Sequence, residues 1–231
     1  MSEPKPFNPL DKVNLAISID TALLRSNPIP LKEIQEFQGA GVYALYYVGD
    51  FPCYRPISMV NSCKVVAPIY VGKAEASGKR KGGFLDVSAS GSTLFKRLSD
   101  HAKSVSQAKN LSIDDFLCRH LVVDETWISL GESMLISKYA PVWNACVDGF
   151  GNHDPGRGRR NGARPKWDML HPGRAWADRL PENPTSRDAI IADIKNHLEI
   201  ECPPSKLIEQ SRYEYGFITM ASPKGDCFAG K

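Results

Sequence analysis

Residues 41–48 read GVYALYYV, and residues 65–72 read VVAPIYVG. Both runs are rich in β-branched and aromatic side chains and have glycine at one end, which is the composition of a β-strand. They contain two short motifs, Gly41-Val42-Tyr43 and Tyr70-Val71-Gly72. The sequence therefore predicts two strands of one sheet, each with a tyrosine. Tyrosines on a sheet often serve only packing, so their meaning depends on the polar residues that follow.

A helix is expected after the second strand, beginning at Ser92 or Thr93 and reaching about Lys109. Arg97 and His101 are four residues apart on this helix, so they share one face, at the edge of its apolar stripe. Their position predicts that Arg97 and His101 lie where the helix leaves the core and lines a cleft. Ordinary surface residues on a helix edge are the alternative.

A third strand is predicted over residues 116–123, followed by a helix that Asp124 caps. Glu132 lies in the middle of the apolar face of that helix. Because an unpaired buried carboxylate costs several kcal/mol, Glu132 should be protonated, paired with a base such as Arg119 or His120, or bound to a metal ion. Glu132 is the most informative single residue of the chain.

The remaining pattern completes an α+β fold, in which a small central mixed or antiparallel sheet is flanked by helices. Further helices are expected over residues 13–24 and 187–200, a closing strand over 213–219, and a loop insertion over 49–64. We expect three regions: an N-terminal arm and helix (1–37), a catalytic core (38–146) and a basic elaboration for DNA recognition packed on that core (147–231).

Composition excludes several classes of protein. Hydrophobic residues make up 42% and charged residues 24% of the chain, as in soluble globular proteins. No apolar run approaches the ~20 residues that cross a bilayer, so no membrane association and a cytoplasmic location are expected. The six cysteines form no C-x-x-C pair, which argues against a zinc site.

A glycine- and lysine-rich stretch over residues 72–83 resembles a phosphate-binding loop but departs from it in spacing, and Arg80 stands where such a loop needs Ser or Thr. We therefore expect no nucleotide cofactor. A basic loop that touches a nucleic-acid backbone is the better interpretation. Lys73 is a candidate phosphate contact, with a solvated loop residue as the equal alternative.

The basic charge is concentrated in one window. Seven basic and two acidic residues between Arg157 and Arg179 give that window +5, against +3 for the whole chain. Arginine suits bidentate contacts to phosphate and guanine, and tryptophans are interleaved here, so we expect a DNA-binding surface rather than a merely solvated face. The candidate DNA contacts in this window are Arg157, Arg159, Arg160, Arg164, Lys166 and Arg174.

Taken in order, the two tyrosine motifs, Arg97, Glu132 and Asn144 resemble the GIY-YIG nuclease superfamily over roughly residues 38–146. His101 and the tail from Gly151 to Arg174 resemble its type II restriction endonuclease branch, and most of all the enzymes that cut CCGCGG. The gap between the two tyrosine motifs is longer than the family's usual connection. The tail also contains His153 and His171, which we expect to be structural rather than catalytic.

The resemblance implies a role for each residue. Glu132 would hold one divalent cation, most simply Mg²⁺, and Arg97 would stabilise the phosphate charge. Tyr43, Tyr70 and His101 would orient or deprotonate the attacking water, and the resemblance points to Tyr43, assisted by His101. Asn144 would position other groups, although a helix-end cap is the simpler alternative.

The resemblance also implies double-stranded DNA as the substrate, a specific GC-rich palindromic site and a two-fold homodimer. Two other functions stay open at this point. One is a structure-specific or repair nuclease of the same superfamily, which usually depends on an attached domain. The other is a DNA-binding protein that has lost catalysis, against which the full set of site residues argues.

Overall fold

The structure is a computed structural model that describes residues 8, 10–75, 91–154, 162–201, 203 and 206. Several predicted features lie outside these residues. They are the arm over residues 1–7, most of the basic loop after Glu75, the closing strand over 213–219, and Arg157, Arg159 and Arg160.

A four-stranded antiparallel sheet forms the centre of the fold, in the order β1-β4-β2-β3. Its strands are β1 (Ile29–Pro30), β2 (Gly41–Tyr47), β3 (Pro68–Ala74) and β4 (Phe116–Val122). All seven residues of β2 are buried, because helices cover the strand on both faces. This explains why β2 reads as a continuous apolar run rather than an alternating one.

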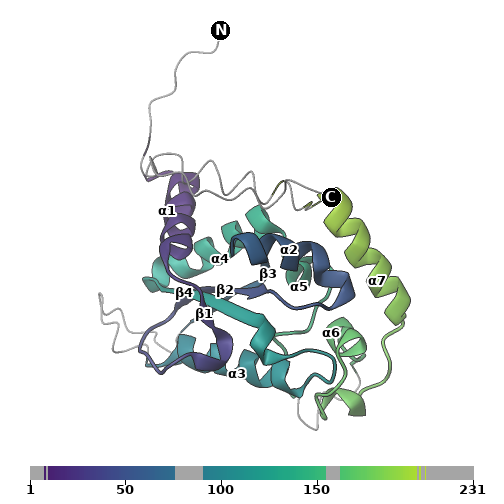
Figure 1. The fold of residues 1–231 in the computed structure, drawn as a ribbon. Coiled ribbons are helices and arrows are strands. Elements are labelled where there is room, and N and C mark those ends of the chain that lie inside the picture. The colour runs from purple at the N-terminus through teal and green to yellow at the C-terminus, as the bar shows by residue number, and fades with distance from the viewer. Residues whose placement is uncertain are drawn as a thin grey trace.

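Helices lie on both sides of the sheet (Figure 1), which confirms the predicted α+β class. Helix α3 (Thr93–Gln107) covers one face, whereas α1 (Lys12–Arg25) and α4 (Glu125–Tyr139) cover the other. Helix α7 (Arg187–Asn196) follows later in the chain and continues into a π-helical turn, η7 (His197–Glu201). Among the described segments, no helix is both long enough and apolar enough to cross a bilayer.

Shorter elements connect these. They are η1 (Leu31–Glu33), η2 (Pro52–Tyr54), α2 (Arg55–Cys63), η4 (Ile113–Asp115), α5 (Val142–Ala145), α6 (Lys166–Leu170) and η6 (Ala177–Arg179).

The segment between the two tyrosine strands is helical, so the prediction of a loop over residues 49–64 was wrong. It forms η2 and α2, because Pro52 and Pro56 stand in first helical turns, where no backbone N–H is needed. The side chains of Ile57 and Val60 are buried against the core. Two prolines in a short segment are typical of a loop, but proline is equally well tolerated at the start of a helix.

The side-chain amide of Asn61 joins this helix to the strands, because both of its N–H groups donate hydrogen bonds and its oxygen accepts two. Its Nδ2 donates to the carbonyls of Tyr47 and Ala67, and its Oδ1 accepts from the N–H groups of Val66 and Ala67. Because Asn61 takes these two N–H groups, β3 begins only at Pro68, three residues later than predicted.

A buried polar network attaches α2 to the C-terminal half of the chain. The Nε1–H of Trp143 donates to the Tyr54 hydroxyl at 2.8 Å, and that hydroxyl lies 2.7 Å from His171 Nε2. His171 Nδ1 lies 3.1 Å from Asn110 Oδ1. All hydrogen-bonding groups of this network are paired if the Tyr54 O–H donates to Nε2 and the Nδ1–H of His171 donates to Asn110. This arrangement requires a neutral His171, because a charged imidazole has no acceptor. His171 is structural in this respect, as expected.

His171 should make the fold sensitive to acid. Burial lowers the pKa of His171 to about 3, whereas an unfolded histidine has its ordinary pKa of about 6.5. Below pH 6.5 the unfolded chain therefore binds a proton that the folded chain does not, and the free energy of unfolding should fall by about 1.4 kcal/mol per pH unit from this residue.

Urea unfolding of the wild type and of His171→Gln between pH 7 and pH 5 measures this effect. The variant should show a shallower loss of stability with acid, by about 2 kcal/mol in total between pH 7 and pH 5. Between pH 7 and pH 8, where His171 is neutral in both states, the two slopes should agree. Equal slopes over the acid range would contradict a neutral His171.

Candidate active site

Tyr43 and Tyr70 form one wall of the site on neighbouring strands. Tyr43 faces Gly72 across the β2–β3 ladder, and its ring centroid lies 6.2 Å from that of Tyr70. A Cβ atom on residue 72 would stand 2.6 Å from Cζ of Tyr43, closer than real Cβ atoms approach other atoms. Glycine at position 72 therefore lets the Tyr43 ring lie flat over β3.

His101 projects from α3 onto Tyr43. The Tyr43 hydroxyl lies 2.5 Å from His101 Nε2, and both side chains are buried. Burial, together with the positive charge of Arg97, holds the pKa of His101 well below its usual range. Burial likewise raises the pKa of Tyr43 well above 10. Near neutral pH the pair is therefore a phenol that donates to a neutral imidazole.

Arg97 lies one helical turn before His101 and faces the same tyrosines. Its guanidinium counteracts the effect of burial on the pKa of both Tyr43 and Tyr70. Its Nη1 also lies 2.8 Å from Nε2 of His153, an exposed residue. A positive group between two phenols and an imidazole is a ready site for an anion such as a phosphodiester.

The segment from Gly149 to His153 closes the site and was missed by the sequence analysis. The Phe150 ring stacks on His101, with centroids 4.5 Å apart and an interplanar angle of 15°. Gly151 packs so closely that a Cβ there would stand 2.7 Å from Arg97 Nη2. His153 was expected to be structural, yet it contacts Arg97. No spacing rule could have found this contact, because the segment reaches α3 only through the tertiary fold.

Glu132 is on the helix that covers the other face of the sheet and lies beside the edge strand β3. Its side chain is 22% exposed, and Lys73 Nζ lies 3.5 Å from its Oε2. Burial raises the pKa of Glu132, and the Lys73 ammonium opposes that rise. Glu132 in turn raises the pKa of Tyr70, which places it within electrostatic reach of the tyrosine wall.

The base beside Glu132 is Lys73, and neither candidate weighed from the sequence is its partner. Arg119 donates to the carbonyls of Ser26 and Val65, and the His120 ring stacks on Phe37.

Lys73 is held in a small polar cluster at the edge of the sheet. Its Nζ donates to Ser129 Oγ at 2.6 Å and lies 3.0 Å from Glu75 Oε1. Ser129 donates onward to Glu75 at 2.7 Å. Ser129 and Glu132 are three residues apart on α4, so both face β3.

The donor set around Glu132 fits a hard divalent cation. Mg²⁺ is commonly held by one or two carboxylates, with water and substrate phosphate supplying the other ligands. Glu132 offers such a half-buried carboxylate, beside Lys73 and within electrostatic reach of Tyr70. Within the described residues, no group of three His, Cys, Asp or Glu side chains converges as in a closed metal cage.

Asn144 lies behind this wall and supports the edge strand. Its Oδ1 accepts from the Val71 N–H, and its Nδ2 donates to the Val71 carbonyl, both at 2.8 Å. The amide thus pairs with Val71 as a neighbouring strand would. Asn144 therefore fixes the backbone between Tyr70 and Gly72, and it is not a helix-end cap.

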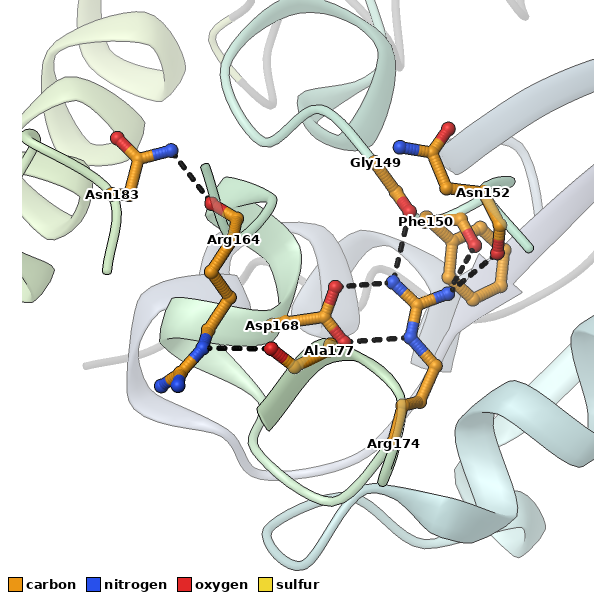
Figure 2. Close-up of polar contacts among 8 residues, drawn as sticks. All are labelled: Gly149, Phe150, Asn152, Arg164, Asp168, Arg174, Ala177 and Asn183. Atoms are coloured by element: carbon orange, nitrogen blue, oxygen red, sulfur yellow. Dashed lines mark hydrogen bonds and ion pairs between the residues drawn. The ribbon is translucent and has the colours of Figure 1, made fainter. Parts of the chain in front are cut away.

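The arginines predicted to contact DNA separate into different environments (Figure 2). Arg174 is 1% exposed, and its donors bind Asp168 and the carbonyls of Gly149, Phe150 and Asn152. It cannot read a base in this arrangement, so the structure does not support the predicted DNA contact of Arg174. Arg174 is buried because the Asp168 carboxylate pairs with it, and no local pattern in the sequence marks this pairing.

Arg164 is half-buried, with Nε donating to the Ala177 carbonyl at 3.1 Å and Nη2 to the Asp178 carbonyl at 3.2 Å (Figure 2 shows the first bond). Lys166 begins α6 and is also half-buried.

Gly72→Ala should misplace Tyr43 and slow any reaction at this site. The added methyl would meet the buried Tyr43 ring, which cannot swing away, so we expect a loss of about 1–3 kcal/mol of stability. The matched control is Gly162→Ala, because a Cβ at residue 162 meets no atom within 4 Å. Thermal unfolding of both variants tests this. Equal melting temperatures would show that Tyr43 does not need the space above Gly72.

A family model described as the Eco29kI GIY-YIG domain matches residues 35–198. This range contains the tyrosine strands, both site helices and the segment that closes over His101. A search among curated proteins gave no match.

Proposed function

The chain belongs to the Eco29kI GIY-YIG family of nuclease domains, and from this membership we propose that it is a type II restriction endonuclease. The proposed reaction is the hydrolysis of phosphodiester bonds in both strands of a specific double-stranded DNA site. The matched family is named for Eco29kI, a restriction endonuclease that cuts CCGCGG. A GC-rich palindrome is therefore the proposed site for this chain.

One observation carries the proposal: Arg97 lies beside two phenols, one of which is hydrogen-bonded to a neutral, buried His101. Hydrolysis of a phosphodiester needs a group that accepts a proton from water and a positive group that stabilises the developing phosphate charge. This cluster supplies both within one helical turn of α3.

The proposed roles follow from the contacts. The Tyr43 hydroxyl accepts a proton from the attacking water as it passes its own proton to His101 Nε2, 2.5 Å away. Tyr43 alone is a poor base because burial raises its pKa, so the imidazole makes the transfer feasible. Arg97 stabilises the phosphate charge. Asn144 holds the backbone of β3 in place, and Tyr70 on that strand helps to position the substrate.

Glu132 is the proposed ligand of one Mg²⁺ per active site. When bound, the ion would neutralise charge on the phosphate and lower the pKa of water. Lys73, now seen beside Glu132 rather than in a free loop, is proposed to contact the DNA backbone at the same edge.

Recognition is proposed to lie in residues 147–231 and catalysis in residues 38–146, with residues 1–37 as an N-terminal arm and helix. Arg157, Arg159, Arg160, Arg164 and Lys166 are the proposed DNA contacts. Because one centre cuts one strand, cutting both strands of a palindrome suits a two-fold homodimer. A cytoplasmic location, where such an enzyme meets incoming DNA, is part of the same proposal.

Incubation of the purified protein with phage DNA and Mg²⁺, followed by gel electrophoresis, tests the function. Discrete bands that end at one sequence support a type II restriction endonuclease. A smear, or nicking only at branched DNA, would indicate the structure-specific nuclease instead. Intact DNA, at every salt concentration and with Mn²⁺ as well, would contradict nuclease activity.

A further inference from the structure

Arg174 is a buried arginine whose every N–H direction is used. Its Nε and Nη2 form a fork on the two carboxylate oxygens of Asp168, at 2.7 and 2.5 Å. Nη1 donates to the carbonyls of Phe150 and Asn152, at 2.9 and 3.1 Å, and Nη2 donates to Gly149 O at 2.9 Å. Figure 2 shows the guanidinium between Asp168 and these three carbonyls.

Two tryptophans fix the plane of the guanidinium. Its carbon lies 4.6 Å from the centre of the Trp167 ring and 4.8 Å from that of Trp176. Burial of a charge is costly unless it is paired and fully hydrogen-bonded, so a group with both rings, a carboxylate and three carbonyls has one allowed orientation. The three carbonyls that it binds are therefore held at fixed positions.

Those carbonyls belong to the segment that closes the active site. Between the first and the last of them lie Phe150, which stacks on His101, and Gly151, which packs against Arg97 and Tyr70. His153, which contacts Arg97, is the next residue. Removal of the guanidinium would take its donors from the Phe150 and Asn152 carbonyls and leave the Gly149 carbonyl with the Asn152 N–H alone, next to the groups that contact His101 and Arg97.

We propose that Arg174 is a positioning residue of the nuclease centre. It holds residues 149–152 against His101 and Arg97 and does not touch DNA. This inference rests on the proposed function for its readout. Arginine is needed because lysine lacks the fork that binds Asp168 and the planar group that stacks between two indoles.

The test compares Arg174→Lys with the wild type under single-turnover conditions at saturating protein. The cleavage rate constant should fall about 10- to 100-fold, because a small displacement near reacting groups has effects of that size. The DNA dissociation constant, measured without divalent metal, should stay within about twofold, since the residue does not reach the DNA.

The pH dependence of the rate separates positioning from a general loss of structure. His101 is faced by Tyr43 and Tyr70 from the sheet, by Arg97 from α3, and by Phe150 and His153 from the closing segment, with Arg174 behind it. Burial is the main reason that the pKa of His101 is low, and Arg97, His153 and Arg174 lower it further. The Phe150 ring, stacked on the imidazole, covers one of its faces. In Arg174→Lys, water should reach His101, and the acid limb of the rate profile should move up towards the ordinary histidine pKa.

Two further variants make the result decisive. Arg119→Lys is the matched control, because Arg119 is also buried, donates to two carbonyls and lies over an aromatic ring, that of Tyr46. Unlike Arg174, it lies on the face of the sheet opposite His101. It should lower the melting temperature and leave the rate constant and its acid limb unchanged. If Arg174→Lys does not fold, Asp168→Asn weakens the same fork without removing the arginine and should shift the acid limb in the same direction.

Phe150→Leu should give the same shift of the acid limb, and Arg174→Lys with Phe150→Leu should be little worse than either variant alone. Additive losses in the double variant, or an unchanged acid limb in Arg174→Lys, would overturn the proposal. Loss of DNA affinity in Arg174→Lys without a loss of rate would show a DNA contact instead. If the wild type cuts no DNA, the proposed function fails. If the wild type cuts and Arg174→Lys cuts equally well, the proposed function stands and the proposal on Arg174 is overturned.

Discussion

Glu132→Gln is expected to abolish cleavage, with a loss of at least about 1,000-fold in the single-turnover rate, or about 4 kcal/mol of transition-state stabilisation. The amide has nearly the shape of the carboxylate but carries no charge, so it binds a divalent cation far more weakly. Specific DNA binding should remain, because Glu132 faces Lys73 and the edge of β3 rather than the basic region.

A second measurement separates metal binding from catalysis. Titration of the protein with Mn²⁺ by calorimetry should show one site in the wild type and a large loss of affinity in Glu132→Gln. Glu125→Gln is the matched control, because Glu125 is an exposed residue of the first turn of the same helix. A Glu132→Gln protein that cuts within about tenfold of the wild type would assign the metal to other residues.

Arg97→Lys is expected to slow cleavage by about 100- to 1,000-fold, the usual cost of removing one donor from a centre that stabilises developing charge. Lysine keeps the positive charge but presents one ammonium instead of a planar fork, so it cannot contact the phosphate while also holding His153 and the two phenols. The effect should appear in the rate at saturating protein rather than in DNA affinity.

Arg25→Lys, an exposed residue at the end of α1, controls for the substitution itself and should be neutral. His153→Ala should cost less than Arg97→Lys, because it removes only one of the contacts that orient the guanidinium. If Arg97→Lys cuts within about threefold of the wild type, the role of Arg97 is electrostatic attraction alone.

The local parts of the site could be predicted from the sequence because they depend on periodicity. Residues four apart on a helix share a face, and this put Arg97 beside His101. A glutamate within an apolar helix face had to have a special environment, and this identified Glu132. The strand that contains Tyr43 could be predicted because both faces of β2 are covered, so its sequence is apolar throughout.

The parts that were missed depend on contacts between distant segments. Phe150 and His153 reach α3 across about 50 residues of chain, and no local pattern marks them. Arg174 counted as a free charge because its partner Asp168 looked like one more acid in a basic region. The helix α2 does not follow from the sequence pattern, because Pro52 and Pro56 are typical of loops, whereas here each stands in a first helical turn.

The pairing of Asn144 with Val71 has a consequence for self-association. Strand β3 is at the edge of the sheet, and an open edge is a template on which another chain can add a strand. Asn144 already occupies the N–H and the carbonyl that Val71 presents outward, so a foreign strand cannot continue the ladder past this residue. At the opposite edge, β1 is only two residues long and Pro30 has no N–H to offer. The amide that supports the tyrosine wall therefore also guards the protein against aggregation through its sheet.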